Sequence, residues 1–99
     1  MKLYEIAHSR AGDKGNTAIL SLTVDDKKDF ELVREKVTPE RVKKWFGSIT
    51  KGEVVRYELP QLGALNFVLK ETLGGGVTTS TALDKHGKSL SSYLLEMEI

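Results

Sequence analysis

Apolar residues alternate with a period of two near the start of the chain and recur with helical spacing further on. Alternation predicts strands over residues 2–8 and 17–24, because successive side chains of a strand point to opposite faces. The second of these strands is the more regular, with an apolar series made of Ala18, Leu20, Leu22 and Val24. Residues 9–16 contain glycine and separate the two strands, so we expect a β-hairpin with a long loop.

Residues 29–46 have the spacing of two short helices. Asp29 is placed to cap the first helix. Thr38 fits the N-cap of the second helix, and Pro39 fits its first helical position. We therefore predict a bent helical pair, with Trp45 as its largest core anchor.

The second half of the chain predicts further elements of both kinds. Residues 53–59 read as a strand that must end at Pro60, because proline has no N–H for a sheet. In residues 62–73 leucines recur at spacings of three and four, which predicts a helix. Residues 77–83 are rich in Thr and Val and predict a strand. Residues 89–97 suit a helix, although the last of them could also pair as a strand.

The element order β-β-α(α)-β-α-β, followed by a last element that is either helix or strand, predicts an α+β fold. Each predicted helix has one apolar stripe, so the expected architecture is a two-layer sandwich: a sheet of about four strands with helices on one face. The chain has 99 residues, which suits one domain over residues 1–99.

Composition excludes several classes of function. The chain has no cysteine, which removes disulfides, thiolate metal sites and a cysteine nucleophile. Its 15 basic and 14 acidic residues are interspersed, which argues against nucleic acid and anionic membranes as partners. The apolar runs are too short to span a membrane, and the N-terminus lacks a signal-peptide pattern, so we expect a cytoplasmic protein.

Residues 9–16 carry more polar chemistry than a connecting turn needs. The glycines of this segment would let backbone N–H groups turn inward, and its two basic side chains would add positive charge. Together, these groups could bind a phosphate or carboxylate. In the alternative, the acidic and amide side chains only cap the turn. The spacing is not that of a Walker A loop. The candidate ligand-binding residues here are Ser9, Arg10, Gly12, Asp13, Lys14, Gly15 and Asn16.

Two further places are candidates for the same site. Gly74, Gly75 and Gly76 are three consecutive glycines, whereas a helix C-cap requires one. The excess indicates either close approach to a ligand or a flexible connection. Asn66 has apolar neighbours, and a buried amide needs hydrogen-bond partners, either structural or in a binding site.

Metal and cofactor motifs are not present in the sequence. His8 and His86 are the two histidines, and their spacing matches no zinc motif. We therefore expect no metal and no cofactor, and no catalytic residue can be named from the sequence.

Four segments resemble, in the same order, the AtuA-like C-terminal domain family: residues 9–16 (SRAGDKGN), 57–69 (YELPQLGALNFVL), 73–77 (LGGGV) and 84–90 (DKHGKSL). The resemblance covers nearly the whole chain and implies a ferredoxin-like fold. It also implies a free-standing version of the domain that ends the acyclic terpene utilisation AtuA proteins. That family is associated with citronellol and geraniol-type breakdown through acyl-CoA intermediates, and it supplies no catalytic residues to carry over.

Three functions fit the sequence. The preferred hypothesis is a non-catalytic accessory or binding domain that assembles with a larger AtuA-like subunit. The second is a protein or enzyme that binds a CoA-linked or carboxylate ligand through the glycine-rich segments. The third is a homo-oligomeric structural protein that uses the uncovered sheet face, where Ile19, Val55 and Tyr57 would supply apolar surface.

Overall fold

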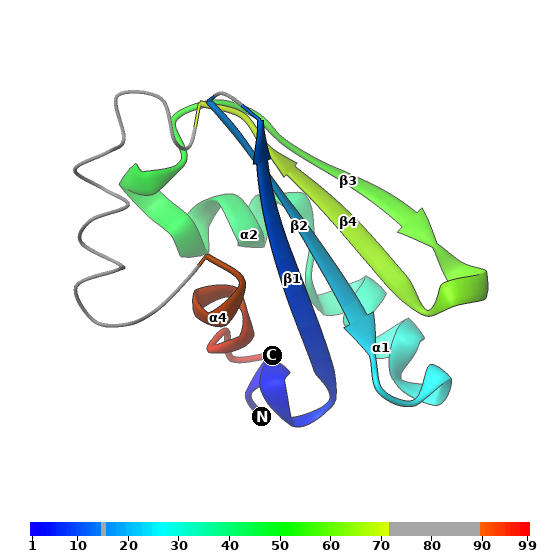
Figure 1. Ribbon diagram of the computed structural model, residues 1–99. Coiled ribbons are helices and arrows are strands. Elements are labelled where there is room, and N and C mark those ends of the chain that lie inside the picture. The colour runs from blue at the N-terminus through cyan, green and yellow to red at the C-terminus, as the bar shows by residue number, and fades with distance from the viewer. Residues whose placement is uncertain (15, 72–89) are drawn as a thin grey trace.

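The computed structural model describes residues 1–14, 16–71 and 90–99, so the predicted strand at 77–83 lies outside the described residues. Figure 1 shows the elements in chain order. They are β1 (Ala7–Lys14), β2 (Thr17–Val24), α1 (Phe30–Lys36), α2 (Pro39–Phe46), β3 (Val54–Leu59), β4 (Ala64–Leu69) and α4 (Leu90–Leu95). Short 3₁₀ turns are Leu3–Glu5, Lys27–Asp29, Gly47–Ile49 and Pro60–Leu62.

The four strands form one antiparallel sheet in the order β1-β2-β4-β3. The helices cover one face of this sheet (Figure 1), because their buried residues join those of the strands in a single core cluster. The predicted α+β architecture, a four-stranded sheet with helices on one face, is therefore confirmed.

The core lies between the helices and the two central strands. On β2 and β4, alternate residues point inward and are buried: Leu20, Leu22, Leu65, Phe67 and Leu69. Phe67 is the largest of the fully buried side chains and lies directly opposite Leu20. From the helices, Phe30, Val33, Val42, Phe46 and Leu94 pack onto this layer.

The predicted helix at 62–73 is wrong, since Ala64–Leu69 forms β4 instead, while residues 72 and 73 lie outside the described residues. Its leucine spacing fits a helix, but from Leu65 to Leu69 the buried residues of the strand alternate with a period of two. Gly63 explains where the strand begins: it has a left-handed backbone (φ +62°), which ends the turn after β3 and returns the chain antiparallel to it. A strand between two others buries one whole face, and this favours pairing over helix formation.

The predicted long hairpin loop is also wrong. After the 3₁₀ turn Leu3–Glu5, β1 begins at Ala7 and stays paired with β2 as far as Lys14, which lies opposite Thr17. Only residues 15 and 16 connect the two strands, and residue 15 lies outside the described part of the chain. Most of the polar segment is thus strand. β1 is a largely exposed edge strand, and its backbone can pair with β2 without apolar side chains. Its polar sequence therefore resembles that of a loop.

The helical pair is confirmed, with a correction at Trp45. Thr38 caps α2 by accepting a hydrogen bond from the Arg41 N–H at 3.1 Å. Trp45 is only partly buried: its ring stacks on Tyr93 at 5.1 Å between centroids, and its Nε1 donates to the Tyr93 carbonyl at 2.9 Å. An indole N–H needs an acceptor, which holds Trp45 at the rim of the core, while Val42 and Phe46 fill the interior.

A guanidinium group ties α1 to the edge of the sheet. Arg56 of β3 points to the helical side, and its Nη1 donates to the carbonyls of Arg34 (2.6 Å) and Val37 (3.0 Å) at the end of α1. Its Nη2 donates to Glu58 at 3.1 Å. The last carbonyls of a helix have no partner within the helix, so these bonds satisfy acceptors that the helix cannot.

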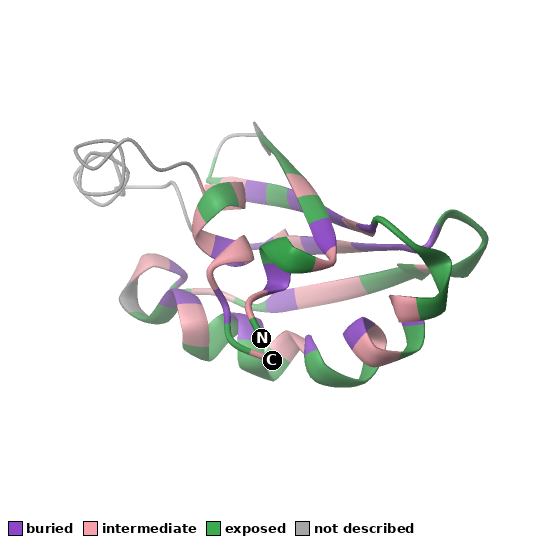
Figure 2. Ribbon diagram, turned by 90° about the horizontal axis from the view of Figure 1, so that it is seen from below, coloured by how far each residue is buried: buried purple, intermediate pink, exposed green. Residues whose placement is uncertain are grey.

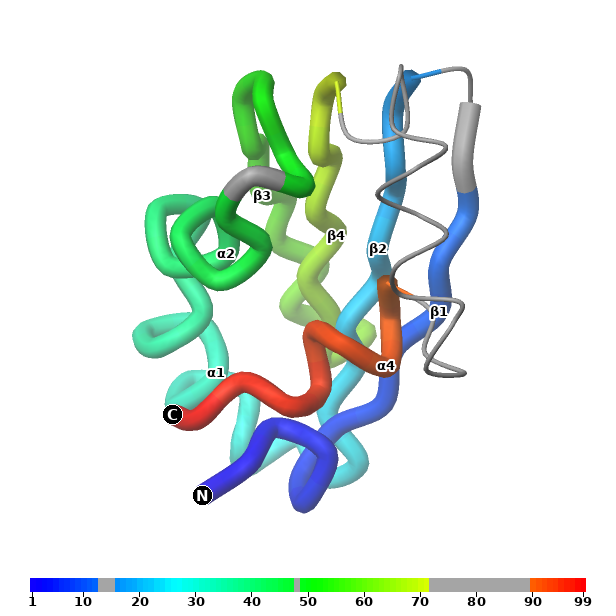
Figure 3. Tube along the Cα trace, turned by 90° about the vertical axis from the view of Figure 1, so that its left-hand side faces the viewer, coloured from blue at the N-terminus to red at the C-terminus, as the bar shows by residue number. Residues whose placement is uncertain are grey.

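The N- and C-terminal segments lie side by side, at the same end of the molecule (Figure 3). The Leu3 N–H donates to the Met97 carbonyl at 3.0 Å, and the Ile99 N–H donates to the Met1 carbonyl at 2.9 Å. After α4, the last residues therefore pair in an extended form, as the sequence allowed, through a bridge between Lys2 and Glu98.

The one-sided core makes a testable prediction about stability. Phe67→Ala should lower the free energy of unfolding by about 3–5 kcal/mol, because it leaves a cavity in the buried layer. Val68→Ala, one position along on the other face of β4, should cost about 1 kcal/mol or less. Urea unfolding measures both, and equal losses would contradict a core confined to one face of the sheet.

Candidate functional site

The second face of the sheet is left open by the described elements. Directly opposite residues of an antiparallel pair point to the same face, so this face is organised in rows that cross all four strands. One row consists of Gly12, Ile19, Val68 and Val55. The next row consists of Arg10, Ser21, Asn66 and Tyr57. The third consists of His8, Thr23, Ala64 and Leu59.

Burial separates this face from the helical one. Buried and less buried positions alternate along the strands, as the colours of Figure 2 show. On the open face Ile19 is 39% exposed and Tyr57 is 56% exposed. Val55 is half-buried beside them. The three positions predicted from the sequence to form an apolar surface therefore do lie on one uncovered face.

The structure brings together only some of the predicted site residues. Arg10 and Asn66 occupy the same row, two strands apart, so their Cα atoms are separated by about 10 Å. Gly12 lies in the adjacent row, and Lys14 pairs with Thr17 at the end of β1. This open face therefore collects the basic, amide and glycine positions that the sequence singled out in separate segments.

Other predicted residues lie elsewhere. Ser9 is paired with Leu22 on the helical side, and its buried Oγ has no hydrogen-bond partner among the described residues. Asp13 is paired with Ala18, and Asn16 is exposed in the turn. Gly15 and Gly74–76 lie outside the described residues. The predicted anion site as a whole therefore stays a prediction, because four of its residues lie outside the described part of the chain.

The described residues give no reason for a glycine at position 12. Its φ is not in the left-handed region, and a Cβ placed on it would meet no atom of the described residues within 4 Å. Its neighbour across the strand pair is the exposed Ile19. The row thus ends in bare backbone, and a missing side chain within a strand is typical of a place where another backbone or a ligand approaches closely.

One ion pair borders the open face. The Nδ1 atom of His8 lies 2.8 Å from an Asp25 carboxylate oxygen, and the two side chains are 61% and 58% exposed. A carboxylate that orients a histidine is a common part of acid–base sites. Here water surrounds the pair, and no enclosed cleft is formed around it by the described residues.

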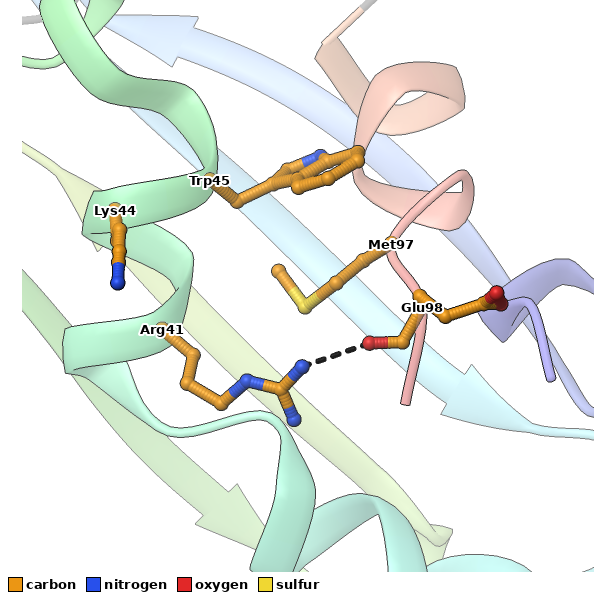
Figure 4. A pocket seen from close by; sticks show the side chains of 5 residues that line it. All are labelled: Arg41, Lys44, Trp45, Met97 and Glu98. Atoms are coloured by element: carbon orange, nitrogen blue, oxygen red, sulfur yellow. Dashed lines mark hydrogen bonds between the residues drawn. The ribbon is translucent and has the colours of Figure 1, made fainter.

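A pocket of about 420 Å³ opens on the helical side of the molecule, between α2 and the C-terminal segment. Figure 4 shows the residues that line it, which are Arg41, Lys44, Trp45, Met97 and Glu98. Its volume lies in the range of small-molecule sites. Sequence reasoning missed this pocket, because the residues of its two walls are more than fifty positions apart. The available signal was the single tryptophan of the chain beside two basic residues of one helix.

Metal binding and membrane insertion find no support in the described residues. Within residues 1–14, 16–71 and 90–99, no three His, Asp or Glu side chains are grouped so that they could hold a metal ion. None of the helices in that part of the chain is both long and apolar enough to cross a membrane.

A family model described as the AtuA ferredoxin-like domain matches residues 1–99. The chain belongs to this family. No curated protein and no solved structure matches the chain. The family resemblance inferred from the four sequence segments is thereby confirmed, and the four-stranded antiparallel sheet agrees with the fold that the family description names.

In this AtuA ferredoxin-like domain, two glycines of the described sheet region should respond oppositely to substitution. Gly12→Ala should preserve stability or raise it by about 0.4–1 kcal/mol, because it restricts the unfolded chain and meets no neighbour. Gly63→Ala should lower stability by about 1–2 kcal/mol, because Gly63 has φ +62° and its Cβ would lie 3.0 Å from Val24. Urea midpoints measure both. A clear loss for Gly12→Ala would mean that the fold itself requires that glycine.

Proposed function

We propose that this protein is a non-catalytic binding domain that docks, through its open sheet face, onto a larger AtuA-like subunit. Family membership supports this proposal, together with the resemblance to a domain that ends the acyclic terpene utilisation AtuA proteins. In this role the domain would take part in the breakdown of terpenoids or acyl-CoA compounds. It would supply a binding surface and leave the chemistry to its partner.

The observation that carries the proposal is the unexplained glycine in the open face. The row that starts at Gly12 continues through Ile19, Val68 and Val55, so an apolar strip leads to bare backbone. Because no described residue requires a glycine there, close approach by another chain is the explanation that we propose. A strand face with exposed apolar residues is also the kind of surface that protein partners cover.

The charges of this face describe the partner. The three rows contain Arg10 and no acidic residue, and their histidine, His8, already faces the Asp25 carboxylate at the border of the sheet. A complementary surface would present apolar side chains to the strip and carboxylates to Arg10, whose guanidinium binds them through two parallel hydrogen bonds. A second copy of this chain would offer no carboxylate to Arg10 from these three rows, which disfavours self-association through the same surface.

Site-specific cross-linking tests the docking face. The chain has no cysteine, so Ile19→Cys provides a single thiol in the open face to carry a photoactivatable cross-linker. In native extract we expect a cross-link to a larger polypeptide that mass spectrometry identifies as AtuA-like. Lys36→Cys, exposed at the end of α1 in the helical layer, is the matched control and should give no such product.

Two results would contradict the proposal. Cross-links from Ile19→Cys only between copies of this chain would favour the homo-oligomeric structural protein. Equal yields of the large product from both cysteines would mean that the open face is not the docking surface. Adding Gly12→Val to the Ile19→Cys protein should reduce the yield of the large product, because the new side chain would block close approach.

A further inference from the structure

The pocket between α2 and the C-terminal segment combines apolar walls with positive charge. Trp45 and Met97 supply the apolar surface, and Figure 4 shows the Met97 side chain pointing into the space between Trp45 and Arg41. Arg41 and Lys44 also belong to α2, the helix of Trp45, and supply the positive charge of the pocket. A ligand that fits this pocket therefore needs both an apolar body and a negative group.

Arg41 has a structural task that fixes the pocket. Its Nη2 donates to the Glu98 carbonyl at 2.7 Å, and its Nη1 donates to the Lys36 carbonyl at 2.8 Å. These two bonds tie the C-terminal segment to the α1–α2 connection. The wall opposite α2 is consequently held in place, and the two terminal nitrogens of Arg41 each donate one hydrogen bond within it.

Lys44 differs from Arg41 because it is exposed and forms no ion pair or hydrogen bond with any described residue. The acidic residue of the pocket does not neutralise it: Figure 4 shows the Glu98 carboxylate pointing away from α2. That carboxylate lies 3.3 Å from the amino group of Met1. The charge of Lys44 is therefore available to a ligand at the mouth of the pocket.

The aromatic wall is rigid. Trp45 is held by its hydrogen bond to the Tyr93 carbonyl at 2.9 Å, and its ring is stacked on Tyr93. Met97 is almost fully buried. The indole, which is fixed in this way, therefore presents an apolar surface without losing conformational entropy on binding, and the buried Met97 lies beside it.

We propose that this pocket binds a small amphipathic anion, with a singly charged carboxylate at Lys44 and a short alkyl chain against Trp45 and Met97. A lysine ammonium is a compact point charge with three rotatable donors, so it can pair with a single small anionic group such as a carboxylate. The pocket is formed by the helical layer, so the site is separate from the open sheet face. The proposal stands or falls independently of docking to a larger subunit.

The single tryptophan of the chain reports on this site directly, because it lines the pocket. Octanoate serves as the probe, and its binding is followed through Trp45 emission in the intact protein. We expect a saturable change in intensity or wavelength. Octyltrimethylammonium, with the same chain length and opposite charge, should produce no saturable change in the same range. Octanol should bind more weakly than octanoate.

Substitution of Lys44 separates the contribution of charge from that of the fold. Lys44→Met should weaken octanoate binding about two- to fivefold, which is the strength of an exposed ion pair, and Lys44→Glu should weaken it more. Lys51→Met removes an equal charge from an exposed residue outside the pocket and should leave the affinity unchanged.

Three outcomes would overturn the proposal. The first is no saturable change with octanoate at millimolar concentration. The second is equal response to octanoate and octyltrimethylammonium. The third is equal weakening by Lys44→Met and Lys51→Met, which would reveal only a general effect of net charge.

Discussion

The paired central strands β2 and β4 bury one face completely and leave the other open, and the rest of the structure depends on this asymmetry. Leu20 and Phe67 lie opposite each other at the centre of the buried side. The helices must lie over these residues, because the apolar stripes of α1, α2 and α4 have no other surface to cover among the described elements. Side chains of β2 and β4 point alternately to the two faces, and this alternation produces both the burial on the helical side and the exposure on the other side.

This division places the two candidate sites on opposite layers. The open face carries the apolar strip, Arg10 and the bare backbone of Gly12, all on elements that the core holds rigid. The pocket at Trp45 depends instead on how the C-terminal segment is fastened to α2, through Arg41 and Tyr93. A protein partner on the sheet and a small ligand among the helices would therefore not compete for the same residues.

The sequence predicts the architecture well where burial follows one period. Thr17–Val24 alternates cleanly and forms β2, and the Thr38-Pro39 start signal marks α2 correctly. The errors occur where two influences compete. The leucines of β4 fit a helical spacing, but β4 lies between two strands, where alternating apolar side chains are buried on one face of the sheet. β1 is an exposed edge strand, so its backbone pairs with β2 although its side chains resemble those of a loop.

The candidate site was predictable only in part, because rows across a sheet depend on register. Nothing local in the sequence links Arg10 to Asn66. They share a row only because β2, which lies between them, pairs with both of their strands. Likewise, Trp45 was expected in the core because of its size, whereas the hydrogen bond of its indole keeps it at the rim. For Gly12 the sequence singles out the residue as a candidate position. The structure is needed to show that the described residues do not require a glycine there.

The most direct test of the central claim compares two tyrosines of nearly equal exposure. In the isolated protein Tyr57, on the open face, is 56% exposed, and Tyr4, in the N-terminal 3₁₀ turn, is 54% exposed. Hydroxyl-radical footprinting of the isolated protein and of its native assembly measures the oxidation of both. Docking through the open face predicts that Tyr57 becomes protected in the assembly while Tyr4 stays reactive. Protection of Tyr4 alone, or unchanged oxidation of Tyr57, would contradict the account.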